Sequence, residues 1–260
     1  MTVKVKFAFL VLAAGLAGSS PSWAADPMAA RLSAERVGGI AAGSYTADAA
    51  DGAGGRQFIL EPYGDKYLLC FLGTQEIFVL TVERGSLGAR LLKYDTGAMA
   101  LRVSVWGGLT LYTYDAPGGI PATRQGDAPV PSLAPVSAPD LSAAMQDEAK
   151  HLRYSQKVAL HFIADPSVMN ADGTTRAVAF DTLTNTVRGI ERFLTQPGAR
   201  KALTQRIDSV RVTEGAKPTV LIAGRSLMVS FVPDEGYEGR ASSHAIAHAL
   251  GKLLQVATPE

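Results

Sequence analysis

The sequence predicts an α+β protein in which an antiparallel β-meander comes first and a helix-and-strand unit follows. In residues 56–114, short apolar runs alternate with turn residues at a spacing of about ten residues, which is typical of strands joined by tight turns. A Pro- and Gly-rich stretch follows, and beyond it apolar residues recur at helical spacing. We therefore expect a β-meander domain over residues 38–116, a linker over 117–139 and an α+β unit over 140–256.

The first 24 residues have the organisation of a secretory signal peptide. Lys4 and Lys6 precede an apolar core over residues 7–16, and Ser22-Trp23-Ala24 places small residues where a signal peptidase cleaves. The alternative is a membrane anchor, but the apolar core is shorter than the roughly 20 residues that a spanning helix needs. We expect cleavage after Ala24 and a periplasmic protein with no transmembrane span after cleavage.

Charge is nearly balanced. The chain has 25 basic and 24 acidic residues, and removal of Lys4 and Lys6 leaves 23 basic residues against 24 acidic ones. Such a balance gives no long-range attraction to nucleic acid, so we expect no nucleic-acid partner. The mild basic cluster over residues 188–211 includes Glu191 and Asp208 and has the pattern of a solvated helix face.

Strands of the predicted meander differ in how they expose their two faces. Leu101, Val103 and Val105 alternate with polar or bulky neighbours, as in a sheet with one solvated face. Residues 67–72 and 77–82 are apolar on both faces, so these strands should be covered on both sides, either inside a closed barrel or beneath another element. The pattern leaves open whether the meander stays an open sheet or closes into a small barrel.

Aromatic side chains of the meander are the candidates for a ligand pocket, and we select Tyr67, Trp106, Tyr112 and Tyr114. The alternative is that they pack across strands, which aromatic residues favour in any sheet. The single cysteine, Cys70, lies in an apolar run and is expected to behave as a small buried hydrophobic residue.

The second half predicts the order helix, strand, helix, three strands, helix. The expected strands cover residues 158–163, 207–212, 219–222 and 227–232, with the last two forming a hairpin around Gly224. The longest helix should extend from residue 174 or 175 to 196, and Ser242 or Ser243 should cap a closing helix that reaches about residue 256. His151 and His161 stand isolated in this half.

The closing helix contains two histidines four residues apart, His244 and His248. The sequence HAIAHALG resembles the HExxHxxG helix of zinc metallopeptidases, in which the histidines bind zinc and the glutamate activates water. Ala245 replaces that glutamate, and we expect no third ligand downstream. The helical wheel places the pair opposite Ile246, so we expect both histidines to face solvent and to bind no metal. The alternative that the motif leaves open is a bound zinc ion.

Several short segments are similar to a family of uncharacterised exported proteins from alphaproteobacteria, known only as a domain of unknown function. The resemblance involves residues 43–45, 76–81, 95–97, 107–112, 116–119 and 242–243. It implies no activity and transfers no functional residues.

Export without a complete catalytic set of residues predicts a noncatalytic binding or envelope-associated protein, whose partner is a small molecule or another envelope protein. The first alternative is a degenerate module similar to zinc metallopeptidases, carrying His244 and His248 without the catalytic glutamate. The second is a purely structural envelope protein, which would have an exposed apolar patch and no pocket.

Overall fold

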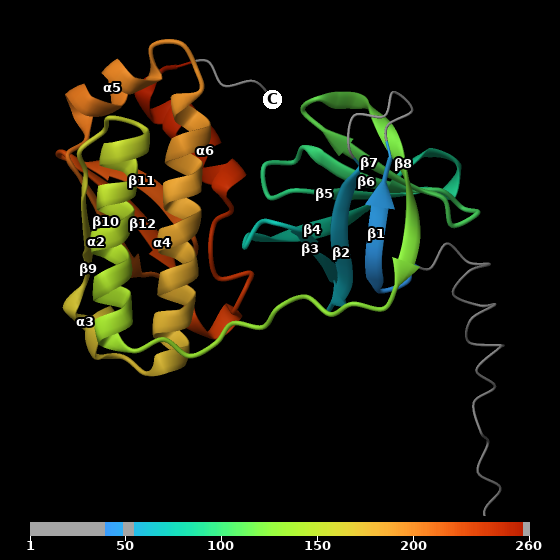
Figure 1. Ribbon diagram of the computed structural model, residues 1–260, viewed down its shortest axis with the longest axis horizontal. Coiled ribbons are helices and arrows are strands. Elements are labelled where there is room, and N and C mark those ends of the chain that lie inside the picture. Colours follow the sequence, from blue (N-terminus) through green and yellow to red (C-terminus); the bar gives the residue numbers. More distant parts are fainter. Residues whose placement is uncertain (1–39, 49–54, 257–260) are drawn as a thin grey trace, which may run out of the picture.

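The computed structural model describes residues 40–48 and 55–256 (Figure 1). The predicted signal peptide, residues 1–24, and the predicted domain start at residue 38 lie outside the described residues. Within them, the chain forms a β-barrel followed by a part built from helices and a four-stranded sheet, which we call the α/β part.

Eight antiparallel strands form the barrel. They are β1 (Gly43–Ala47), β2 (Arg56–Tyr63), β3 (Lys66–Phe71), β4 (Ile77–Arg84), β5 (Arg90–Lys93), β6 (Met99–Val103), β7 (Leu109–Thr113) and β8 (Ala116–Gly126). Each strand pairs with the next, and β8 pairs with β1 to close the sheet. The prediction of an antiparallel N-terminal β part is confirmed, and the question of closure is decided in favour of the barrel.

The barrel interior is a hydrophobic core. Leu92, Leu101 and Leu111 face one another across β5, β6 and β7, and all three are fully buried. Phe58 stacks on Tyr45 with their ring centroids 5.4 Å apart. An eight-stranded barrel has an interior just wide enough for its own side chains, and this one is filled in that way.

Two expectations about this region are wrong in detail. Residues 117–126, expected as linker, belong to β8, because pairing with β7 and β1 outweighs the low strand propensity of proline and glycine. Gly119 has a φ of +84°, and a Cβ there would lie 2.5 Å from Cγ2 of Thr110, so the strand needs glycine at this bend. Val105, expected in the alternating core pattern, lies beyond the end of β6 and is 38% exposed.

The segment between β8 and the first helix of the α/β part is held against the barrel. The backbone N–H of Val130 donates a 2.7 Å hydrogen bond to Glu61 of β2, and the Val130 side chain is buried. Residues 127–137 have no regular secondary structure, yet they contribute Val130 and Leu133 to a hydrophobic cluster.

The α/β part agrees with the predicted order of elements and has two further short helices, one after the first strand and one after the longest helix. It consists of α2 (Ala138–Ser155), β9 (His161–Ala164), α3 (Pro166–Asn170), α4 (Gly173–Leu194), α5 (Ala199–Arg206), β10 (Ser209–Glu214), β11 (Thr219–Ala223), β12 (Ser226–Phe231) and α6 (Ser243–Leu254), with the 3₁₀ turn η2 (Pro233–Glu235) before α6. No helix among the described residues has both the length and the hydropathy that crossing a membrane requires.

The sheet of the α/β part has the order β11-β12-β10-β9, in which β9, β10 and β12 are parallel and β11 is antiparallel to β12. The β11–β12 hairpin was predicted and is confirmed. Helices α2, α4 and α6 lie side by side over one face of this sheet (Figure 1). Helix α4 is in the middle, and its buried stripe includes Leu183, Val187 and Ile190.

Candidate functional site

The barrel and the α/β part meet along a largely buried contact that we call the seam, formed by Glu76, Asp95, Asp181, Arg240, Ser242, Ser243 and His244, of which only Asp95 is exposed. Apolar residues surround it. Leu68, Cys70 and Ile77 on the outer barrel surface pack with Val130 and Tyr237. The expectation that residues 67–72 and 77–82 are covered on both faces is confirmed over most of their length, because Leu69 and Phe78 of the same strands face the barrel core, whereas Leu72 is 49% exposed and Thr81 is exposed.

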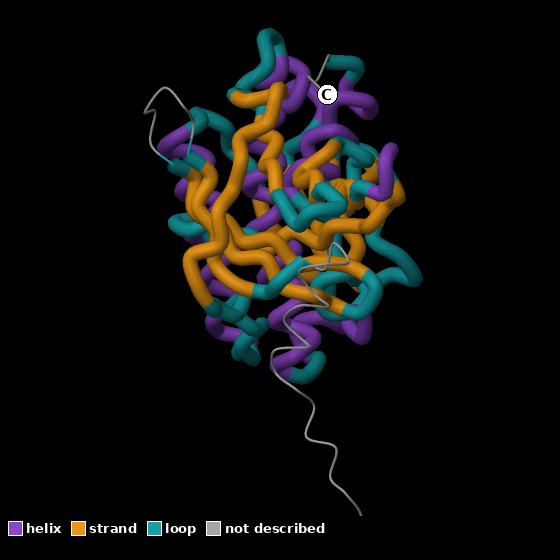
Figure 2. Tube along the Cα trace, turned by 90° about the vertical axis from the view of Figure 1, so that its right-hand side faces the viewer, coloured by secondary structure: helices purple, strands orange, loops and turns teal. Residues whose placement is uncertain are grey.

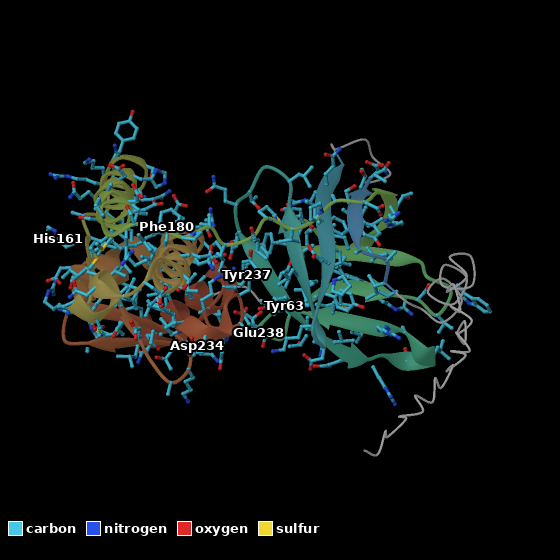
Figure 3. The ribbon with its side chains drawn as sticks, turned by 90° about the horizontal axis from the view of Figure 1, so that it is seen from below. Tyr63, His161, Phe180, Asp234, Tyr237 and Glu238 are labelled. Atoms are coloured by element: carbon cyan, nitrogen blue, oxygen red, sulfur yellow. The ribbon has the colours of Figure 1, made fainter. Side chains whose placement is uncertain are left out.

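Aromatic and charged contacts continue the seam toward the β2–β3 turn. Tyr63 of β2 and Tyr237, which follows η2, pack edge to face with ring centroids 6.0 Å apart (Figure 3). Lys66 forms an ion pair with Glu238 beside them. The Tyr237 hydroxyl donates to the carbonyl oxygen of Pro131, so the same residue also holds the connecting segment in place.

Two barrel carboxylates bind the first turn of α6. Asp95 accepts hydrogen bonds from the backbone N–H of Ser242 at 2.9 Å and from its hydroxyl at 2.7 Å. Glu76 does the same for Ser243, at 2.8 and 2.7 Å. The first N–H groups of a helix lack intrahelical partners and carry partial positive charge, so carboxylates are favoured there. The barrel therefore caps a helix of the α/β part.

Glu76 is the most buried of these acids, at 2% exposure. Burial raises its pKa, and the hydrogen bonds from Ser243 and the nearby positive charge of Arg192 act in the opposite direction. Nε of Arg192 donates to the Ser243 hydroxyl at 2.8 Å, and Nη2 of Arg192 lies 3.9 Å from the Glu76 carboxylate.

A buried ion pair of the α/β part lies at the seam and contacts the barrel. Arg240 forms an ion pair with Asp181 of α4 and donates a 2.8 Å hydrogen bond to the carbonyl oxygen of Ile77 in the barrel. Arg240 is 5% exposed and Asp181 8%. Charges this deeply buried require all their partners, because an unpaired one is strongly unfavourable.

His244 belongs to the seam and does not face solvent, so that expectation is wrong. Its ring packs against Phe78 at 5.0 Å and Tyr94 at 4.6 Å, measured between ring centroids. The wheel argument treated α6 alone, whereas the barrel covers the polar side of the helix. Burial lowers the pKa of His244 to about 4, with a smaller contribution from the charge of Arg192. Burial also raises the pKa of Tyr94 above its usual range.

The seam combines a serine, a histidine and carboxylates, yet the serine is not accessible to a substrate. Ser243 is fully buried and both of its polar groups are occupied by Glu76. Residues 40–48 and 55–256 contain no group of three or more His, Cys, Asp or Glu side chains placed to hold a metal ion. His248 is half-buried one turn farther along α6. The geometry makes the seam a joint between the two parts.

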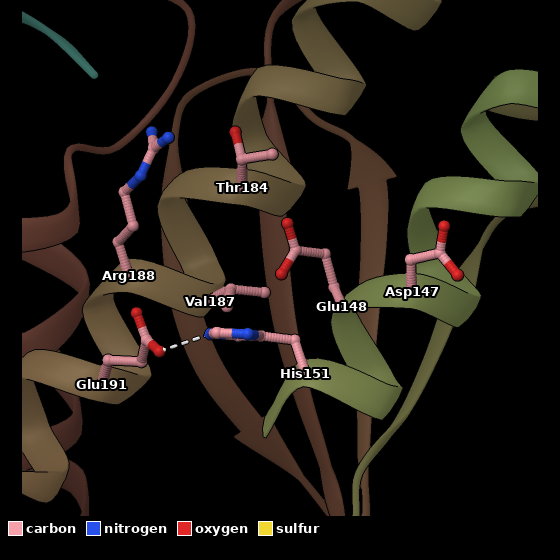
Figure 4. A pocket seen from close by; sticks show the side chains of 7 residues that line it. All are labelled: Asp147, Glu148, His151, Thr184, Val187, Arg188 and Glu191. Atoms are coloured by element: carbon pink, nitrogen blue, oxygen red, sulfur yellow. Dashed lines mark hydrogen bonds and ion pairs between the residues drawn. The ribbon is translucent and has the colours of Figure 1, made fainter. Parts of the chain in front are cut away.

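An open groove lies between α2 and α4. It encloses about 340 Å³ and is lined by Asp147, Glu148, His151, Thr184, Val187, Arg188 and Glu191 (Figure 4). His151 Nε2 lies 2.7 Å from Oε1 of Glu191, while the Glu148 carboxylate is directed across the groove toward Thr184.

Glu148 is the distinctive group of this groove. Its side chain is half-buried, and it forms no ion pair with any described residue. Burial raises the pKa of Glu148, and the charges of His151 and Arg188 partly offset that effect. The groove therefore holds a carboxylate that a positively charged group would stabilise.

The aromatic residues selected from the sequence do not converge on one cleft. Tyr67 packs against the barrel core. Tyr112 is half-buried on β7, where its ring lies close to Gly119. Trp106 and Tyr114 are 91% and 79% exposed and lie in the turns at opposite ends of β7. Their role in ligand binding stays a prediction.

The groove residues were not selected from the sequence. His151 was treated as isolated and residues 188–211 as a solvated face. The usable signal was spacing, because Thr184, Val187, Arg188 and Glu191 recur at three and four residues and so share one face of α4. Nothing in the sequence pattern indicates that α2 packs beside that face.

The fold and the groove thus define an α+β protein with a closed barrel and a charged interhelical groove. Residues 30–250 match the model of a family described as a domain of unknown function (DUF4908), and the chain belongs to that family. This confirms the family resemblance found in the short segments. No curated protein and no solved structure matches the chain.

We expect Arg240→Ala to lower the free energy of unfolding by about 3–5 kcal/mol, because it leaves the Asp181 carboxylate buried without a partner. Urea denaturation followed by circular dichroism measures the change. Arg225→Ala is the matched control, since Arg225 pairs with Asp208 at the exposed surface and its loss should change stability little. Equal effects of the two substitutions would contradict the importance of the seam.

The depressed pKa of His244 predicts a pH dependence. The unfolded chain takes up a proton near pH 6.5 and the folded chain only near pH 4, so acid favours unfolding in this interval. The contribution of His244 to the free energy of unfolding should decrease as the pH falls, by at most about 1.4 kcal/mol per pH unit. Urea titrations of the wild type and of His244→Phe from pH 7 to about pH 4 give the free energy of unfolding at each pH. The difference between the two proteins in the slope of this free energy against pH measures the contribution of His244.

His248→Phe is the control for this experiment, because His248 lies on the same helix outside the ring contact with Phe78 and Tyr94. Its slope should match that of the wild type. An unchanged slope in His244→Phe would show that the seam does not hold this histidine neutral.

Proposed function

We propose that the chain is an exported, noncatalytic binding protein of the cell envelope, and that it takes a small cationic ligand in the groove between α2 and α4. The observation that carries the proposal is Glu148, a half-buried carboxylate without an ion-pair partner on a groove of about 340 Å³. That volume is in the range of small-molecule sites, roughly 300–1,000 Å³.

The other groove residues support a cation over an anion. Asp147, Glu148 and Glu191 contribute three carboxylates, against Arg188 and the His151 that Glu191 already engages. An ammonium group placed beside Glu148 would replace lost hydration with a charge-assisted hydrogen bond. The aliphatic stem of Arg188 offers apolar surface for the rest of the ligand.

A binding role suits the groove better than catalysis because its one hydroxyl is already engaged. Oγ1 of Thr184 donates to the carbonyl oxygen of Asp181 at 3.1 Å, within the backbone of α4. The serine and histidine that would suit nucleophilic chemistry are enclosed in the seam. Export is supported by the basic, apolar and small-residue sequence of residues 1–24.

Isothermal titration calorimetry with two four-carbon probes tests the ligand class. Putrescine presents ammonium groups and succinate presents carboxylates. We expect putrescine to bind and Glu148→Gln to weaken binding by about tenfold or more, the equivalent of about 1.4 kcal/mol. Glu214→Gln, which removes an exposed carboxylate from β10, should bind as the wild type does. Tighter binding of succinate, or no effect of Glu148→Gln, would overturn the proposal.

N-terminal sequencing of the protein recovered from a periplasmic extract tests export. We expect Ala25 as the first residue, because Ser22-Trp23-Ala24 supplies the small residues at the cleavage site. Recovery of the intact chain from the cytoplasm, beginning at Met1, would contradict it.

A further inference from the structure

Two neighbouring turns of the barrel present apolar side chains to solvent. One turn joins β4 to β5 and contains η1 (Ser86–Gly88), and the other joins β6 to β7. Leu87 and Trp106 are each 91% exposed, and Val105 is 38% exposed. The turns touch, because a Cβ on Gly88 would lie 3.0 Å from Cγ2 of Val105. We call Leu87, Val105 and Trp106 together the apolar tip.

Leu87 is held outward by an unfavourable backbone conformation. Its φ is 56° and its ψ 29°, in the left-handed region that glycine and asparagine adopt far more readily than leucine. The barrel therefore carries a strained residue whose large apolar side chain makes almost no contact with the rest of the fold. Strained residues cluster at functional sites.

Three arginines lie in the strands that lead into the apolar tip. Arg84 and Arg90 are paired in register at the base of the first turn, and Arg102 precedes the second turn in β6. In the described part of the chain none of the three forms an ion pair, and residues 84–94 and 96–114 contain no acidic residue. The nearest acid in sequence, Glu83, is paired with Lys93.

The apolar tip is directed away from the α/β part. It lies beyond the C-terminal ends of β4 and β6, whereas Glu76 and Asp95, which bind α6, lie in the connections at the opposite ends of these strands. Figure 1 shows the α/β part on the other side of the barrel, and Figure 2 views the molecule from the barrel side. This end of the barrel is free of the rest of the chain's described residues.

We propose that the apolar tip and its three arginines bind the surface of an anionic lipid bilayer. Tryptophan favours the headgroup layer, where its amphipathic ring has both apolar and polar neighbours, and Leu87 would enter the acyl boundary beside it. Arg84, Arg90 and Arg102 would contact lipid phosphates. The mature chain is nearly neutral, so the attraction is local to this end of the barrel.

The shape of the surface favours lipid over a protein partner. A stable protein interface typically needs about 800 Å² from each partner and a fitted, extended contact. Here two narrow turns project a few large apolar side chains, with cations behind them, which suits insertion into a deformable headgroup layer. None of these residues lines the α2–α4 groove, so this proposal is independent of the ligand proposed there.

Tryptophan fluorescence provides a direct test, because Trp106 is the only tryptophan in the chain from residue 25 onward. That chain is titrated with phosphatidylcholine vesicles and with vesicles that also contain phosphatidylglycerol. We expect the emission to move to shorter wavelength only with the anionic vesicles, and each of Arg84→Gln, Arg90→Gln and Arg102→Gln to weaken partitioning by about fivefold, the equivalent of about 1 kcal/mol.

Leu87→Asn tests the apolar contact without endangering the fold, since asparagine tolerates the left-handed conformation. It should weaken partitioning by about tenfold. Leu72→Asn is the matched control, because Leu72 is 49% exposed in the β3–β4 connection at the other end of the barrel, and its partitioning should equal that of the wild type.

No shift with anionic vesicles would overturn the proposal, as would equal partitioning into neutral vesicles. A shift that grows with protein concentration in the absence of vesicles would assign the apolar tip to contact between copies of the chain and would overturn the lipid assignment. Unchanged vesicle binding in Glu148→Gln would support the separation of the tip from the groove, and lost binding would contradict it.

Discussion

The contact of two barrel carboxylates with the first turn of α6 is the interaction on which the arrangement of this protein depends. Glu76 and Asp95 lie in separate barrel connections, and each accepts two hydrogen bonds from a serine at the start of one helix. Helix ends need partners for their free N–H groups, and here those partners come from the other part of the molecule. Barrel and helix therefore satisfy each other's polar groups.

The pair of Arg240 and Asp181 strengthens this dependence. Asp181 belongs to the central helix α4, and Arg240 reaches from the segment before α6 to a barrel carbonyl oxygen. Separating the barrel from the α/β part would expose apolar surface and remove the hydrogen bond between Arg240 and the carbonyl oxygen of Ile77. The position of α4, and with it one wall of the groove, is thereby tied to the barrel.

The two proposed surfaces lie at different places relative to this joint. Arg188 stands between the seam and the groove, because it lines the groove and its charge also acts on Glu76 and Cys70. The apolar tip lies at the far end of the barrel strands. A bilayer bound at the tip would leave the groove accessible, and the seam would hold the groove at a fixed position relative to that surface.

The strand-and-turn pattern of residues 56–114, the β11–β12 hairpin and the serine cap of α6 follow from the sequence alone, because each depends on residues that are neighbours in the chain. Burial of Cys70 and coverage of both faces of β3 and β4 were predictable for the same reason. Closure of the barrel, recruitment of residues 117–126 into β8 and enclosure of His244 depend on partners far away in sequence. The pairings of Glu61 with Val130 and of Glu76 with Ser243 cannot be recognised from the neighbouring sequence. The seam and the groove likewise form only when strand pairing and helix packing bring distant residues together.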